Sequence, residues 1–492
     1  MLLIRVGGLR LLNLFGLFSL GLFLFTSSLY AGTFENFQTT NIKHIQDVKT
    51  FEDFQTVQIK SEGGSEFLSN QQWNSYEPFV AKTLFDANKP KIISSLREKK
   101  IKDVGPKIRI VIARKKLYKK VNIKVIPKDI TVDFFSTTLS FNVPNKLADA
   151  MFFPQTQKGI GNFFKVIAYT EYNYIINEIE DIKKEMNLND WGLYLLVKKI
   201  SNQIFPNNDN ANLFTWFVFD KMGYSVRASI LRKHIVVVFK TKQSINYTPY
   251  YKINGELFYV LDSKAEKGVI YTYSKDSANA IKLFDLSLKE LPNLNLDIKS
   301  KELRFKQQNK EYIFTYKYNQ NIIDFMQTYP QVQSDVFFNA PLDDISYQSI
   351  GKSLKEYVDR ERANTAINFV LHFVQNAFKY QNDIDQFGKE KFMFAQETLY
   401  YDKSDAEDRV ALFSYLIKKF FSFSVIGIKY KDHMIAGLHI PLLGDSVMDG
   451  KRKFIVADPT YNNANIGQNI AKYKLLEPLK LIKLKKDKGV RR

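Results

Sequence analysis

The sequence predicts an α+β protein in which one core unit occurs twice, with strand-rich modules beside the two copies. Blocks of β-branched alternation and blocks of helical pattern follow one another along the chain. One arrangement of helix and strands recurs at an offset of 199 residues. The chain has 492 residues, of which 45% are hydrophobic, and this length and composition suit two to four packed domains.

The first 31 residues differ from the rest of the chain. Arg5 and Arg10 precede an apolar run from Leu11 to Phe25, and a short segment of mostly small residues follows and ends at Ala31. This order is typical of a secretory signal peptide that is cleaved near Ala31. An uncleaved membrane anchor is the alternative, although the apolar run is short for a membrane span. We therefore expect an exported protein, periplasmic or at the cell surface.

Two features of the composition limit the chemistry. The chain contains no cysteine, so it forms no disulfide and offers no thiol nucleophile. Its net charge is +20, which favours acidic partners such as an anionic surface. A solvated basic surface is the plainer interpretation, because lysines are concentrated only in the run 480–492. Nucleic acid is not expected, since no binding motif for it occurs.

The expected elements follow in order along the chain. Residues 32–75 are polar and weakly patterned, which indicates a linker. We expect helices at 76–100, within 145–205, at 211–222, within 353–380 and at 405–420. We expect strands at 108–112, 121–126, 130–134, 226–231, 235–240, 257–261, 425–430, 434–440 and 453–457, with further short strands within 264–345. Within 145–205, Asp190 is the expected cap of a helix that runs through Ile204.

The recurring arrangement places histidine and aspartate at matching positions. The offset of 199 aligns Leu213–Phe217 with Leu412–Leu416 and His234 with His433. After a shift of three residues, Asp262 aligns with Asp458. Each copy is thus expected to contain a helix, a strand, a strand that bears histidine and a strand that ends in aspartate. Chance similarity between two helix-strand units is the alternative.

The C-terminal copy carries the parts of a catalytic triad except its nucleophile. Ser404–Glu407 fits the capping box S-x-x-E with Ser404 as the cap, so Ala406 is expected in the first turn of a helix. A cysteine there would have its pKa lowered by the helix dipole. His433 and Asp458 are the candidate base and orienting acid.

The runs Phe373–Asp383, Glu397–Tyr401 and Ser404–Arg409 resemble those of exported bacterial transglutaminase-like proteins, which belong to the papain-like cysteine hydrolases. The resemblance covers about residues 367–469. It implies a papain-like core with the nucleophilic cysteine at position 406, and with His433 and Asp458 as the catalytic pair. Gln375 is a candidate oxyanion donor, with a surface helix glutamine as the alternative.

Alanine at position 406 removes the nucleophile, so we expect no covalent catalysis. The N-terminal copy is degenerate: it retains His234 and Asp262, but Asn207 aligns with Ala406 and is expected in an irregular loop. The predicted function is a non-catalytic pseudoenzyme of the cell envelope that binds protein or peptide in a papain-like cleft. One alternative is a cysteine-type amide hydrolase or acyl transferase, if cysteine is native at position 406. Another is a basic adhesion or scaffold protein.

No cofactor is expected, and no metal, because no cluster of His, Asp and Glu has metal-ligand spacing. The sequence gives no indication of the oligomeric state. The expected domain organisation is a signal peptide at 1–31, a linker and helical segment at 32–100, a strand-rich module at 101–145, the degenerate transglutaminase-like unit at 146–263, a second strand-rich module at 264–350, the transglutaminase-like domain at 351–475 and a basic tail at 476–492.

Overall fold

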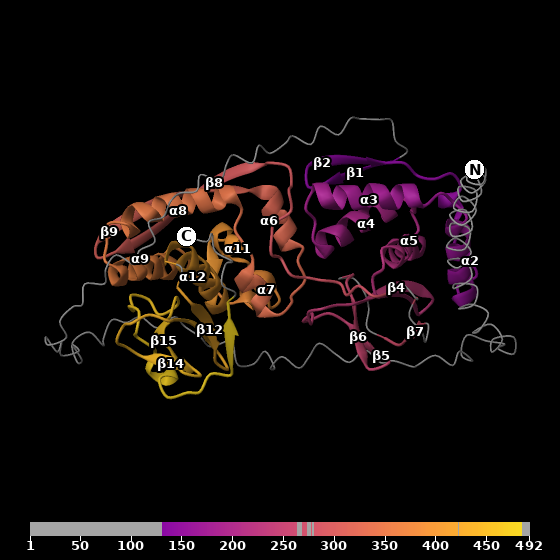
Figure 1. Ribbon diagram of the computed structural model, residues 1–492. Helices are drawn as coiled ribbons and strands as arrows, with labels where there is room; N and C mark the ends of the chain where they lie inside the picture. Colours follow the sequence, from indigo (N-terminus) through magenta and orange to yellow (C-terminus); the bar gives the residue numbers. More distant parts are fainter. Residues whose placement is uncertain (1–129, 263–267, 273–276, 278–279, 422, 485–492) are drawn as a thin grey trace, which may run out of the picture.

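The computed structural model describes residues 130–262, 268–272, 277, 280–421 and 423–484. The predicted signal peptide, the linker, the strands at 108–112 and 121–126, and the last eight residues of the basic tail lie outside this part. The described chain is a mixed α+β structure with two halves, one on each side in Figure 1. Among its helices, none is long and apolar enough to span a membrane.

The N-terminal half begins with a strand hairpin, continues with helices and ends in a five-stranded sheet (Figure 1). Its elements are β1 (Ile130–Phe134), β2 (Thr137–Phe141), α2 (Gln157–Ala168), α3 (Asn173–Glu185), α4 (Asp190–Ile204), α5 (Asn208–Lys221), β3 (Val226–Leu231), β4 (His234–Lys240), β5 (Tyr250–Ile253), β6 (Glu256–Val260) and β7 (Ile270–Thr272).

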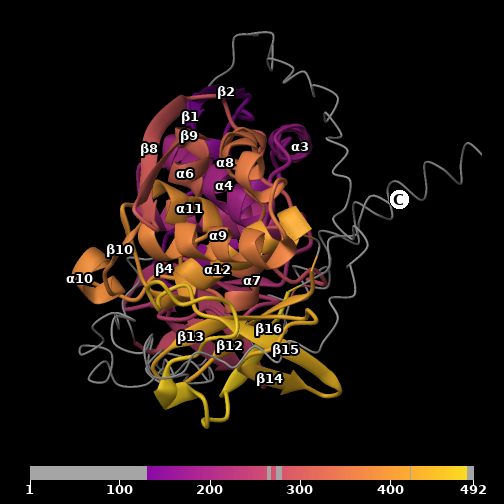
Figure 2. The same cartoon turned by 90° about the vertical axis from the view of Figure 1, so that its left-hand side faces the viewer.

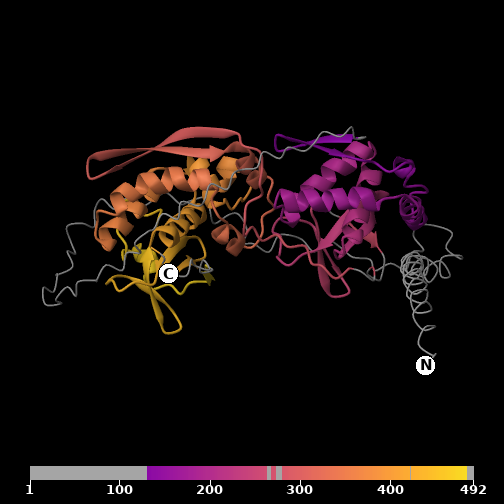
Figure 3. The same ribbon diagram turned by 45° about the horizontal axis from the view of Figure 1, so that its top comes forward.

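The C-terminal half repeats this order with more helices. Its elements are β8 (Ile298–Gln307), β9 (Lys310–Asn319), α6 (Gln320–Gln327), α7 (Ser334–Asn339), α8 (Asp344–Val358), α9 (Ala363–Asn376), β10 (Lys379–Tyr380), α10 (Asp383–Phe387), α11 (Ala395–Tyr400), β11 (Lys403–Ser404), α12 (Ala406–Phe421), β12 (Val425–Lys429), β13 (Met434–Leu438), β14 (Ser446–Asp449), β15 (Arg452–Ala457) and β16 (Lys480–Lys483). Figure 3 shows the β8–β9 hairpin along the outer side of these helices.

The two five-stranded sheets have the same topology. The strand order is β5-β6-β4-β3-β7 in the first sheet and β14-β15-β13-β12-β16 in the second. All neighbouring strands in both sheets are antiparallel. The strands β3 and β12, which follow the two central helices, start 199 residues apart. The described structure therefore contains the repeated helix-and-strand arrangement that the sequence offset predicts.

A buried central helix fills the core of each half. In α12 every residue from Ala406 to Ile417 is buried, and α5 is buried along most of its length. Both helices carry apolar residues on nearly all sides, which is typical of a helix enclosed by other elements. Figure 2 shows the sheet of β12–β16 on one side of α12 and the helices α8, α9 and α11 toward the other.

The connection from α12 into the sheet decides where the candidate residues lie. The strand β12 follows α12 after a short connection and packs against it, so it runs back toward the start of the helix. The strand β13 then begins near that end, and β15 returns to it because Ala457 pairs antiparallel with Ala436. The first residue before β13 is His433, and the first after β15 is Asp458.

Several boundaries differ from the predicted ones because asparagine caps were missed. Asn189, and not Asp190, caps α4, since its side chain accepts a hydrogen bond from the backbone nitrogen of Gly192. Asn207 caps α5 and accepts from two backbone N–H groups, so α5 begins before residue 211. The expectation of an irregular loop at Asn207 is therefore wrong, because asparagine is a favoured helix cap.

Two predicted modules also have a different content. The segment 264–350 contains β7 and the β8–β9 hairpin, but it also contains α6, α7 and the start of α8. Part of the predicted basic tail is a sheet strand: β16 pairs with β12 at the edge of the second sheet. The two apolar residues of β16 are adjacent, and Ile482 is buried while Leu481 is partly exposed.

Candidate active-site remnant and the pocket of the N-terminal half

His433 and Asp458 form a buried pair. His433 Nε2 lies 2.9 Å from Asp458 Oδ2, and the two residues are 1% and 0% exposed. The other carboxylate oxygen, Oδ1, accepts from the hydroxyl and the backbone nitrogen of Thr460 and from the backbone nitrogen of Tyr461. Burial raises the pKa of Asp458, but the charge of His433 and the hydrogen bonds from His433 and Thr460 outweigh it, so the pKa lies below its ordinary value.

The orientation of the His433 ring is fixed on two sides. Its plane stacks on the ring of Tyr473, with centroids 4.9 Å apart. Because the Asp458 carboxylate accepts from Nε2, this nitrogen carries the proton. In a base held by an orienting acid, the ring nitrogen that the acid does not hold serves the nucleophile, and in His433 that nitrogen is Nδ1. The pair therefore has the geometry of a base and its orienting acid.

Ala406 is the first residue of α12 and is 3% exposed. Its helix is capped one residue later than predicted. Asp405 and Asp408 accept from each other's backbone N–H groups, at 3.4 Å in both directions. Ser404 is not the cap, since it belongs to β11 and its hydroxyl accepts from Arg409 Nε at 3.1 Å. This reciprocal pair still places Ala406 at the positive end of the helix dipole.

Gln375 joins the start of α12 to the end of β15. Its side-chain nitrogen donates to the backbone oxygens of Asp458 and Ala464, at 2.9 and 3.0 Å. Its own backbone oxygen accepts from Arg409 Nη1 at 3.1 Å. The residue is buried, so it is not a surface glutamine. Both amide hydrogens are used in these bonds, so Gln375 presents no donor for an oxyanion, and its role here is positioning.

Arg409 lies in the first turn of α12 and links it to neighbouring segments through its guanidinium group. Its guanidinium is buried and donates to Ser404 Oγ, to the backbone oxygen of Gln375 and to that of Phe378. The same group lies 5.7 Å from the ring centre of Tyr380. Burial lowers its pKa to about 10, which leaves it protonated at neutral pH. The segment 375–378 and the side chain of Ser404 are thus tied to this helix start.

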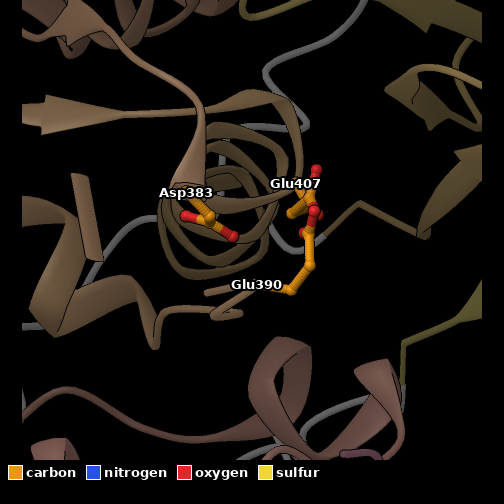
Figure 4. Close-up of side chains that lie close together, drawn as sticks. All are labelled: Asp383, Glu390 and Glu407. Atoms are coloured by element: carbon orange, nitrogen blue, oxygen red, sulfur yellow. The ribbon is translucent and has the colours of Figure 1, made fainter. Parts of the chain in front are cut away.

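A cluster of carboxylates surrounds the same helix start (Figure 4). One group joins Asp383, Glu390 and Glu407, and a second joins Asp383 to Asp405 and Asp408. In each group, one oxygen from each residue lies within 4.8 Å of the others. Such oxygens could share a proton or a hard cation such as Ca²⁺. The expectation of no metal-ligand cluster overlooked this group, because α10, a loop and α12 bring together residues far apart in sequence.

Shared protons are indicated by the pKa values of the cluster. Burial raises the pKa of Asp383 to about 10, with further increases from the charges of Asp408 and Glu407. Burial also raises the pKa of Asp408 to about 7, helped by the charge of Glu407. The pKa of Asp405 lies well above its ordinary value for the same reasons. A carboxyl group that keeps its proton at neutral pH relieves the repulsion among its neighbours.

A loop of the N-terminal half reaches this cluster. Between β4 and β5, Ile245 forms a β-bridge with Val332, and the backbone nitrogen of Asn246 donates to Gln331 at 2.6 Å. Next in the chain, Tyr247 has its pKa raised to about 12, first by burial and then by the charges of Glu390, Glu407 and Asp383. The charges of the carboxylates at the start of α12 thus act on the phenol of Tyr247, which is about half exposed.

In the N-terminal half, the matching residues line one pocket but do not pair. His234 Nδ1 lies 3.3 Å from Asp209 Oδ2, whereas Asp262 Oδ2 lies 3.9 Å from Lys198 Nζ. The ring of His234 is largely exposed, unlike that of His433. All four residues line a pocket of about 520 Å³. In this half His234 thus pairs with Asp209 of the central helix α5 and not with Asp262.

Comparison of the chain with protein-family models, curated proteins and solved structures finds no match. The transglutaminase-like resemblance of the motifs stays a prediction.

Proposed function

We propose that the protein is a non-catalytic transglutaminase-like protein of the cell envelope, which binds protein or peptide in a papain-like cleft. One observation carries the proposal. A buried His433–Asp458 pair has the geometry of a base and its orienting acid, and the helix start that the motif assigns to the nucleophile has alanine. The shared strand order of the two sheets supports a duplicated core with a cleft at the same end of each.

Alanine has no lone pair with which to attack a carbonyl group, and the neighbouring hydroxyl does not replace it. Thr460 Oγ1 donates to Asp458 Oδ1 at 2.7 Å and lies 3.5 Å from His433 Nε2, on the side of the ring that faces the acid. It is fully buried. Loss of a triad nucleophile lowers kcat by about 10⁶-fold in a well-studied serine hydrolase, so the pair is expected to support no covalent turnover.

If a cysteine is native at position 406, its thiol must be able to lose its proton near neutral pH. A thiol at position 406 would gain from the helix dipole and from His433, both of which favour thiolate. The neighbouring carboxylates Asp405, Glu407 and Asp408 oppose thiolate wherever they are ionised. The pKa of a cysteine placed there therefore reports which influence dominates.

The substitution Ala406→Cys tests the positional argument directly, since it gives the only thiol of a cysteine-free chain. We expect this thiol to react with a small electrophile such as methyl methanethiosulfonate near neutral pH. In the double variant with His433→Ala, the rate should fall at least about tenfold as thiolate is lost. Equal rates in the two variants would mean that His433 does not serve position 406, and the triad interpretation would be wrong.

The envelope location rests on the sequence of residues 1–31, which has the order of a signal peptide. Fractionation of cells that express the full chain should place it outside the cytoplasm, with a mass lower by the cleaved segment. A full-length protein that stays with the cytoplasmic fraction would contradict this location.

A further inference from the structure

The pocket of the N-terminal half has the size of a small-ligand site. Its volume of about 520 Å³ lies within the usual range of such sites, about 300 to 1,000 Å³. It is formed by α4, α5, the β3–β4 turn, the first part of β4, and Asp262 just after β6. Its lining includes the cations Lys198 and Arg232, the acids Asp209 and Asp262, the amides Asn202 and Asn208, and the apolar residues Leu231 and Val236.

Lys198 supplies an incompletely compensated positive charge. Its ammonium group donates to Asn212 Oδ1 at 2.6 Å and lies 3.9 Å from Asp262 Oδ2, beyond hydrogen-bond length. Its side chain is only 20% exposed. An ammonium group has three donors, and among the described residues Asn212 takes one of them. Burial lowers the pKa of Lys198, as expected for a cation that has lost much of its hydration.

The acids of the pocket are engaged elsewhere. Asp209 accepts from the backbone nitrogen of Ile235 at 2.7 Å with one oxygen and lies 3.3 Å from His234 Nδ1 with the other. Asp262 keeps 42% of its side chain exposed, and its Oδ2 lies 3.9 Å from Lys198 Nζ. Two cationic side chains, Lys198 and Arg232, line the pocket, and the ammonium group of Lys198 has donors left for a ligand.

We propose that this pocket binds a carboxylate carried by a short peptide or an acylated amino acid. The carboxylate accepts hydrogen bonds from the ammonium group of Lys198, which exchanges lost water for a charge-assisted partner. The side-chain amides of Asn202 and Asn208 offer a donor and an acceptor each to the peptide groups, and Leu231 and Val236 form an apolar wall. This inference deepens the proposed binding function by assigning it to the N-terminal half.

The lining favours this chemistry over a sugar. Sugar rings usually pack on an exposed aromatic face, whereas the aromatic residue of this pocket, Tyr194, is buried and stacks on Trp191. Inorganic phosphate is the other anion that a lysine could bind, and the test below separates it from a carboxylate.

The test measures calorimetric binding to the full chain with two probes of equal shape. N-acetyl-L-glutamate should bind at one site per chain, and N-acetyl-L-glutamine amide, in which both carboxylates are replaced by amides, should bind at least about tenfold more weakly. Lys198→Gln should weaken the binding of N-acetyl-L-glutamate at least about tenfold. Lys199→Gln is the matched control, because Lys199 donates to the backbone oxygen of Asp133 and does not line the pocket.

A second variant guards against misfolding of the first. Val236→Trp fills the pocket from its apolar wall and leaves Lys198 in place, so it should also abolish binding. Equal affinity for the two probes, equal or tighter binding of inorganic phosphate, unchanged binding in Lys198→Gln, or no saturable binding would each overturn the inference. None of these outcomes alters the reactivity of the Ala406→Cys thiol, so failure here is distinguishable from failure of the triad interpretation.

Discussion

The side-chain amide of Gln375 donates to the backbone oxygen of Asp458 across 2.9 Å, and this bond fastens α9 to the strand end that holds the His433 pair. The same amide donates to Ala464, and the backbone of Gln375 accepts from Arg409. One buried residue therefore couples the helix start at Ala406 to the residues that would serve a nucleophile there.

Replacement of Gln375 by leucine should destabilise the C-terminal half by about 2 kcal/mol or more, because two buried carbonyl oxygens each lose a side-chain donor. Urea unfolding measures the change. The matched control is Gln203→Leu, on the exposed side of α4, which should stay within about 0.5 kcal/mol of the parent. Equal stability of the two variants would show that the Gln375 bonds do not hold the site together.

Arg409→Met should cost about 3 kcal/mol or more, since it leaves three acceptors without the donors of one guanidinium. Arg409→Lys should also destabilise the protein, because a lysine cannot reach Ser404, Gln375 and Phe378 together. Thermal unfolding compares both with Arg360→Met at an exposed position. A lysine variant as stable as the parent would indicate that only the positive charge matters.

The carboxylate cluster predicts that stability falls as pH rises. The pKa of Asp383 is raised from its ordinary value to about 10, so the folded state binds a proton that the unfolded state releases near pH 4. The stabilising contribution of this proton is complete below pH 4 and is lost progressively as the pH rises toward 10. Asp408 adds a similar loss up to about pH 7.

Asp383→Asn removes this titration while it keeps an oxygen that can accept from the backbone nitrogen of Lys391. The stability difference between this variant and the parent should therefore grow in favour of the variant from pH 5 to pH 9. Asp385→Asn, at the exposed position two residues later, is the control. Parallel pH profiles for parent and Asp383→Asn would contradict the prediction.

Asn207→Ala should cost about 1 kcal/mol, because the side chain of Asn207 caps α5 by accepting from Asp209 and Asn210. Asn207→Asp should preserve most of the stability, since aspartate accepts the same bonds. The neighbouring Asn208→Ala, at an exposed position, is the control in chemical denaturation. A cost at 208 equal to that at 207 would argue against the cap.

Local patterns were sufficient for elements whose sequence is distinctive. The strand Val226–Leu231 has the predicted bounds, and α12 begins within one residue of its predicted start. The predicted caps at Asp190 and Ser404 are wrong, because the neighbouring residues Asn189 and Asp405 accept from first-turn backbone N–H groups, those of Gly192 and Asp408. Several polar residues in succession leave the choice of cap to the backbone geometry.

The contact partners of the candidate residues cannot be predicted from sequence spacing alone. His433 and Asp458 were chosen together by motif and lie together, whereas His234 meets Asp209 in place of Asp262. The roles of Gln375 and Arg409 carried no clear signal, since their bonds connect segments separated by more than 30 residues. The acids next to Arg409 in the sequence, Asp405, Glu407 and Asp408, are the one hint that the sequence offers.

The sequence by itself determined the α+β elements, the repeat at an offset of 199 residues and the absence of a thiol nucleophile, because periodicity and residue identity are local properties. Only the tertiary structure decided that the C-terminal pair is sealed from solvent, that the matching end of the N-terminal half opens into a pocket, and that five carboxylates meet at the start of α12. These features depend on how strand ends and helix starts pack against each other, and packing brings together residues that no spacing in the chain relates.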